Sequence, residues 1–411
     1  MRSEELTYRT IRLILLLATV LLLNACSDDP SPDGQRVSVE VMSCSTDFED
    51  VGDRMGTRAW TPPSSYVLYS DIFGPNGMFA DQKDLVHKSI KAFFTQGTDV
   101  QERFFYYRET QESKWHMDAD LENVSTSPFQ LYGYIPVEDA EGANISPLNG
   151  NYSNGAVLTI TGLSTITPSD VCVIIGAKDG NEDGNNYNEA TAYDVSNLTA
   201  GKFDVTFNTG ENAKNYIFLL FDHIYSSLRF RFTVDATYNA LRTIRLTKLE
   251  LIAYTSASVG GVKSQYDATI TLRTNSTGAS PIVGSIGFTP TSGSSDVSYT
   301  PLYEWDGAVN TTEQPNNEVI LKPEKETNFM GSFVPGVNTY FKLRSTYDVF
   351  DKEGNLIRKD CQAENTIDLR EKFEISESLN GHCYSYTIKV QPTYLYVLSE
   401  PDVDNPTVVV N

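Results

Sequence analysis

The chain has 411 residues and a formal net charge of −22, from 32 lysines and arginines against 54 aspartates and glutamates. This acidic balance argues against nucleic acid and against anionic membrane surfaces as partners, and the length predicts two domains, or at most three, that each bury a core. The 23 tyrosines and 20 phenylalanines, together with many threonines and valines, favour strands.

The N-terminus has the layout of a secretory signal. Three arginines within the first 12 residues precede an apolar run over residues 13–23, which is too short to span a bilayer as a mature helix. The run ends in Leu23-Asn24-Ala25-Cys26, which resembles the lipobox of bacterial lipoproteins. The resemblance implies that residues 1–25 are removed and that Cys26 is acylated. The following Ser27-Asp28-Asp29 resembles the surface-export tag of Bacteroidales lipoproteins; the alternative is an ordinary signal peptide with a chance cysteine.

A short strand and a basic site follow a polar spacer. Val37, Val39 and Val41 alternate with polar residues, which predicts a strand over 37–41. An acidic, glycine-containing stretch then leads to Arg54-Met-Gly-Thr-Arg58-Ala59, which looks cleavable by a protease. An ordinary N-terminal strand with a loop behind it explains the same residues equally well.

From Trp60 to about Asn212 the pattern is that of an antiparallel sandwich, with Gly, Pro, Asn and Asp clusters between short strands. In Lys202–Phe207 the residues Phe203, Val205 and Phe207 are expected on one face. A short helix is expected at Asp81–Lys91. The predicted strands are Ser89–Thr95, Arg103–Glu109, Phe129–Val137, Ala156–Thr161, Val171–Ile175 and Lys202–Phe207.

The polar stretch Thr209–Asn215 predicts a domain boundary, after which strands continue to the C-terminus. Strict alternation over Leu228–Val234 predicts a strand with one buried face. Leu241–Ile252 changes register near Lys248, which indicates a bulge. Further strands are expected at Asp267–Arg273, Ile282–Phe288, Val319–Lys322, Tyr340–Asp348, Leu356–Cys361 and Tyr384–Val390, with a hairpin turn at Asp351–Gly354.

The last twenty residues are unusually apolar for a chain end. Thr393–Leu398 reads as a strand with apolar groups on both faces, and Pro406–Asn411 carries three consecutive valines. Ordinary termini are polar and frayed, and a free tail of this kind is an aggregation hazard unless something covers it.

Taken in order, these features resemble the fimbrillin family, the type V pilins of Bacteroidales. The resemblance covers essentially the whole chain. It rests on the lipobox at Cys26, the site Thr57-Arg58-Ala59, the core strand around Phe221–Phe230, the hairpin Tyr347–Leu356 and the closing strand Gly381–Val390. None of these is an enzymatic motif.

The resemblance implies an all-β protein of two tandem transthyretin-like antiparallel β-sandwich domains after a signal and a propeptide. The domains are expected at 1–25 (signal), 26–58 (propeptide), 59–212 (N-terminal sandwich) and 213–411 (C-terminal sandwich, with a donor tail at about 392–411). An arginine-specific protease would cut between Arg58 and Ala59, although Arg54 and Arg36 are also candidates. Loss of the pro-strand (Val37, Val39, Val41) would open a groove.

The C-terminal strand of another pilin subunit would fill that groove by strand addition. The expected precursor is an outer-membrane lipoprotein, and the mature protein a cell-surface fimbrium subunit that supports adhesion to a host or bacterial ligand. The expected donor residues are Tyr394, Leu395, Tyr396, Val397, Leu398, Val408, Val409 and Val410.

The rival interpretation is a lipid-anchored surface glycan-binding protein that would stack sugars on Trp60, Trp115 or Trp305. No cofactor, metal site or catalytic set is expected, because there is no Ser–His–Asp order and no His/Cys metal spacing.

Three further features bear on that expectation. The loop Asp179–Gly184 resembles the start of a calcium loop but lacks the acidic twelfth residue, which here is Ala190. His223 is expected to be a satisfied core histidine. Cys361 and Cys383 could pair, but small buried thiols are commoner.

Overall fold

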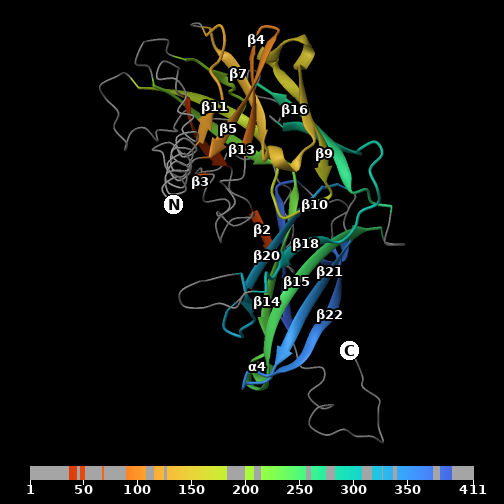
Figure 1. Ribbon diagram of the computed structural model, residues 1–411. Helices are drawn as coiled ribbons and strands as arrows, with labels where there is room; N and C mark the ends of the chain where they lie inside the picture. The colour runs from red at the N-terminus through yellow and green to blue at the C-terminus, as the bar shows by residue number, and fades with distance from the viewer. Residues whose placement is uncertain are drawn as a thin grey trace, which may run out of the picture.

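The computed structural model describes residues 37–43, 47–50, 67–68, 89–107, 115–124, 127–182, 200–207, 214–255, 261–274, 283–307, 317–325, 327–336, 340–373 and 380–390. Strands dominate this part of the chain and form several mainly antiparallel sheets (Figure 1), so the predicted all-β class is confirmed. Within the described residues no helix is long and apolar enough to cross a membrane.

A nine-stranded sheet forms the wall of the upper half in Figure 1. Its strands run in the order β11-β13-β1-β6-β5-β4-β7-β12, with β3 paired to β1. A second pairing, of β11 with β7 through Cys172 with Ile135 and Val173 with Tyr134, closes the sheet on itself. The strands are β1 (Val37–Ser43), β3 (Val67–Leu68), β4 (Ser89–Gln96), β5 (Asp99–Tyr107), β6 (Trp115–Met117), β7 (Phe129–Ile135), β11 (Cys172–Glu182), β12 (Asp204–Val205) and β13 (Lys214–His223).

A four-stranded sheet, β17-β16-β9-β8, packs against this wall. It consists of β8 (Gly142–Pro147), β9 (Gly155–Ser164), β16 (Gln265–Arg273) and β17 (Val283–Pro290). The upper half therefore has two cores. Phe94, Leu131 and Leu219 belong to the core enclosed by the closed sheet, whereas Tyr132, Leu158 and Ile270 belong to the core between the two sheets.

The lower half is a sandwich of two five-stranded sheets. One runs β10-β20-β14-β23-β2, and the other β18-β15-β21-β22 with β19 beside β15. They enclose a third core that includes Phe230, Leu251, Phe341 and Tyr384. The strands are β2 (Asp47–Asp50), β10 (Ile166–Thr167), β14 (Ser226–Val234), β15 (Thr243–Tyr254), β18 (Thr300–Glu304), β19 (Val319–Ile320), β20 (Thr327–Phe333), β21 (Tyr340–Phe350), β22 (Leu356–Asp368) and β23 (His382–Val390).

Among the described residues, helices occupy only short connections. Asp235 caps α4 (Ala236–Leu241) by accepting hydrogen bonds from the N–H groups of Thr237 and Tyr238. The others are α5 (Leu369–Phe373) and the 3₁₀ turns η2 (Val137–Asp139), η3 (Leu148–Gly150) and η4 (Tyr152–Asn154).

Several local predictions are confirmed. In β14 the side chains of Leu228, Phe230, Phe232 and Val234 are buried, as strict alternation requires. The bulge in β15 lies between Leu246 and Lys248. The hairpin turn after β21 is held by Asp351, whose carboxylate accepts from the N–H of Asn355 at 2.7 Å.

Other local predictions differ from the structure. Residues 89–91 of the expected helix are strand; its other residues lie outside the described part. The segment Lys202–Phe207 forms only a two-residue strand, although Phe203, Val205 and Phe207 are all buried. The alternation predicted correctly which side chains are buried. The strand is short because β7 pairs with only two of these residues.

Strand pairing does not follow the expected boundary at residue 212. β13 completes the wall of the upper half, and β16 pairs with β9 in the same half. The chain passes repeatedly between the two halves, for example from β13 to β14 and from β15 to β16 (Figure 1). The two halves are therefore interleaved in sequence rather than consecutive.

Candidate functional site

Strand β1 is the segment whose position bears most directly on function. It lies between β13 and β6 in the wall of the upper half, parallel to β13 and antiparallel to β6. All seven of its residues pair with β13, from Val37 opposite Asn215 to Ser43 opposite Phe221. β1 is thus an interior strand of the sheet, and both of its edges are used.

The strand next to β1 carries part of the enclosed core. Ile217, Leu219 and Phe221 alternate along β13, are fully buried and belong to the core inside the closed sheet. Without β1 the wall would be open between β13 and β6. The backbone groups of β13 on that side would lose their partners, and this core would lie next to the gap.

Strand β2 follows β1 after three residues and joins a different sheet. It runs parallel to β23 in the lower half, from Asp47 opposite His382 to Asp50 opposite Ser385. In the strand order β2 is the outermost strand of its sheet, and β23 has β14 on its other side. The segment 37–50 therefore contributes one strand to each half of the molecule.

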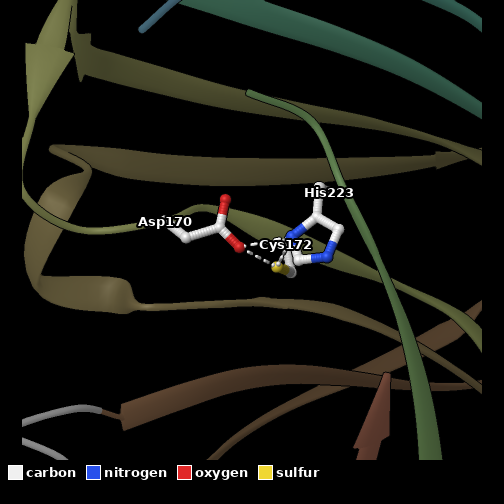
Figure 2. Close-up of side chains that lie close together, drawn as sticks. All are labelled: Asp170, Cys172 and His223. Carbon is white, nitrogen blue, oxygen red and sulfur yellow. Dashed lines mark hydrogen bonds and ion pairs between the residues drawn. The ribbon is translucent and has the colours of Figure 1, made fainter. Parts of the chain in front are cut away.

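The crossover from β13 to β14 carries a buried polar cluster of Asp170, Cys172 and His223 (Figure 2). Nδ1 of His223 lies 2.5 Å from Oδ2 of Asp170, and the Cys172 thiol donates to the same oxygen at 2.7 Å. One oxygen of Asp170 is therefore shared by the imidazole and the thiol. The side chains of Asp170 and His223 are 0% exposed.

This geometry is that of a hydrogen-bonded network. The three ligand types suit Zn²⁺, but zinc bonds of about 2.0–2.3 Å would separate tetrahedral ligand atoms by about 3.3–3.7 Å. Here the separations are 2.5, 2.7 and 3.2 Å. As predicted, His223 is a buried core residue, and its Nδ1 is hydrogen-bonded to Asp170. Sequence spacing did not reveal the cluster, because the pairing of β11 with β13 brings Cys172 opposite His223.

Neighbouring hydrogen bonds stabilise the same crossover from β13 to β14. The N–H of Ile224 donates to the carbonyl oxygen of Val171 at 3.0 Å, and that of Gly381 to Tyr225 at 2.6 Å. The hydroxyl of Tyr225 donates to the Ser164 carbonyl at 2.6 Å. Burial raises the pKa of Tyr225 well above its usual range. This network fixes how β13 continues into β14.

Several predicted site residues lie outside the described part of the chain. These are Cys26, Arg58 and Ala59, together with every donor residue of the tail. For Val37, Val39 and Val41 the structure gives the backbone pairing described above.

Trp305, which the glycan-binding alternative would use for stacking on sugars, and Cys361, a candidate for a disulfide, both lie in the described part of the chain. Trp305 stacks on Arg245, whose guanidinium carbon lies 4.0 Å from the ring centroid. Arg245 is itself ion-paired to Asp348 at 3.0 Å. Cys361 is a free, half-buried thiol.

No family model matches the chain, and no curated protein matches it. Among solved structures, the chain is similar to a candidate cell adhesion protein from Bacteroides uniformis, with 13% identity, a TM-score of 0.35, and coverage of 87% of this chain and 94% of that one. It is also similar to a fimbrial protein from Bacteroides vulgatus, with 11% identity, a TM-score of 0.36, and coverage of 86% and 95%.

Proposed function

We propose that the chain is a structural pilin subunit of surface fimbriae. It is exported as a lipoprotein acylated at Cys26, activated by cleavage after Arg58, and polymerised when the C-terminal tail of another subunit replaces β1. The observation that carries this proposal is the position of β1. A strand upstream of the expected cut is an interior strand of the upper wall, paired along its whole length to β13.

Proteolysis would create the acceptor site. A cut after Arg58 separates β1 from the rest of the chain. All the other strands of the wall lie after residue 58 and stay in the mature subunit. The open edge of β13, with Ile217, Leu219 and Phe221 behind it, then favours any strand that restores the ladder. The uncut precursor keeps its own strand in this position and stays monomeric.

The tail leaves the subunit far from this site. The carbonyl oxygen of Val390, the last residue of β23, accepts from the N–H of Asp235, which caps α4. Figure 1 places α4 at the pole opposite the upper half. A tail starting there and an acceptor in the other half favour a head-to-tail joint, which gives a fibre because it does not close.

The burial of tail side chains can stabilise the joint between subunits without covalent bonds. Burial of about five side chains from Tyr394–Leu398 contributes on the order of 1.5–3 kcal/mol each, and ordering the tail opposes this. Dissociation requires the whole strand to leave, so the joint is stabilised kinetically. The fibre would then present the subunits for adhesion at the cell surface.

Tail deletion tests this function. The purified precursor and a variant ending at Thr393 are treated with an arginine-specific protease and imaged by negative-stain electron microscopy. We expect fibres from the full chain and trimmed monomers from the variant. Fibres from the truncated chain, or from untreated precursor, would contradict the proposal.

A further inference from the structure

We infer that the propeptide upstream of Arg58, called the leader below, covers two strand edges rather than one. We infer further that the donor tail of the next subunit pairs with β23 as well as with β13. This inference rests on the proposed function and adds a second contact to it. The observation is that β1 and β2, separated by three residues, belong to the upper wall and to the lower sandwich, respectively. Both lie upstream of Arg58, so one cut releases both.

Loss of β2 changes the status of β23. In the order β10-β20-β14-β23-β2, removal of β2 leaves β23 as the edge strand of its sheet. The segment of β23 that β2 covers spans His382–Ser385 and includes Tyr384, which is 0% exposed and belongs to the lower core. An uncovered edge beside a buried aromatic residue is a template for strand addition.

The edge strand β23 is held in place by its pairing with β14. β23 is parallel to β14 over eight paired residues, from Ser227 opposite Cys383 to Val234 opposite Val390. Across this pair, Nε of Arg229 donates to the Ser385 hydroxyl at 2.9 Å. The edge therefore keeps its shape when β2 leaves, and it is preorganised for a new strand.

The tail is long enough to cover both edges. Residues 37–50 of the leader cover about 46 Å when extended, and residues 391–411 of the tail can cover about 69 Å. The leader has two strands separated by three residues, and the tail has two apolar segments, 394–398 and 408–410, separated by nine residues. In the direction that β1 follows, Tyr394–Leu398 takes the place of β1, and Val408–Val410 takes the place of β2 beside β23.

Cysteine crosslinking tests the leader half of the inference. Phe48 and Cys383 are paired residues of the two parallel strands, and paired positions lie within the Cα separation that a disulfide needs. In precursor carrying Cys26→Ser, Cys44→Ser and Cys361→Ser, Phe48→Cys is expected to keep the leader fragment attached after protease treatment until a reductant is added. The matched control Glu49→Cys is paired with Tyr384 and is expected to release it. Release from both variants would overturn the inference.

The same background tests the donor half. Val408→Cys, Val409→Cys and Val410→Cys are made singly, the protein is cut with arginine-specific protease, and assembly is first checked on an unheated detergent gel. Oxidised samples are then boiled without reductant. We expect at least one variant to form an intersubunit disulfide with Cys383. Its yield should be about tenfold above that of the control Asp404→Cys, which lies between the two apolar segments of the tail, since only paired positions reach disulfide geometry.

The outcomes separate the two proposals. Assembly with no crosslink to Cys383 from any of the three valine positions overturns the second contact and leaves strand replacement at β13 intact. A crosslink confined to single chains means that each tail folds back on its own β23, and this also overturns the inference. Failure of the parent background to assemble overturns the proposed function itself.

Discussion

Removal of β1 with no donor available should strongly destabilise the upper half. The perturbation is a variant ending at Thr393, cut after Arg58, so that the wall opens and cannot be refilled. Seven residues of β1 pair with β13, and two each with β6 and β3. At about one ladder hydrogen bond per paired residue and about 1 kcal/mol net per bond, the β13 edge alone is worth about 7 kcal/mol. Exposure of the core behind β13 adds to that loss.

A loss of this size is large against a typical domain stability of about 5–15 kcal/mol. The assay is urea unfolding of the cut and uncut variant, followed by far-UV circular dichroism. We expect the midpoint to fall by at least about 1 M after cutting. The control is the same variant with Arg54→Ala and Arg58→Ala, treated identically, which should keep the uncut midpoint. Equal stability of cut and uncut protein would refute the assignment of β1 as an integral strand.

Two further predictions concern the buried polar groups. Asp170→Asn should lower the free energy of unfolding by about 1–3 kcal/mol, because it disturbs the buried hydrogen bonds that Oδ2 of Asp170 makes with His223 and Cys172. Lys263→Met, which breaks the exposed pair with Asp296, should cost less than about 1 kcal/mol. Equal losses in thermal or chemical denaturation would show that the cluster does not hold the crossover. Burial raises the pKa of Tyr134 to about 12 and raises that of Tyr225 well above its usual range. Because the unfolded tyrosines ionise near pH 10 and the folded ones do not, stability should be constant below that pH and decrease as pH rises above it. Urea midpoints measured between pH 8 and pH 11.5 check this, and a flat profile, or one unchanged by Tyr134→Phe, would contradict it.

The sequence predicts local strand structure well where alternation is strict. β14 and β15 are both placed correctly, and the register change near Lys248 is a real bulge, because these strands have one face on the lower core and the other toward solvent. Strands without that asymmetry are not found by alternation. β8, with the sequence Gly-Ala-Asn-Ile-Ser-Pro, and β20, which contains Gly331 and three polar residues, gave no such signal.

The arrangement of the halves depends on pairings between residues far apart in the sequence. β16 pairs with β9 across about a hundred residues, and β10 pairs with β20 in the other half. Neither pairing leaves a local pattern, so a polar stretch near residue 212 reads as a boundary although β13 directly after it belongs to the upper wall.

At the candidate site, too, the sequence predicts the local strand but not its partners. Alternation in Val37–Val41 predicts a strand, but nothing in those five residues indicates β13 as the partner or β23 as the partner of β2. Cys172 and His223 likewise read as isolated residues. They meet because Cys172 opens β11, His223 closes β13, and the two strands are antiparallel.

One gel tests the central claim most directly. Purified precursor is treated with an arginine-specific protease and run unheated in detergent, and the N-termini of the bands are sequenced. Strand replacement after cleavage predicts a ladder whose every band begins at Ala59. A single trimmed monomer band, or a ladder whose chains still begin upstream of Val37, would contradict it.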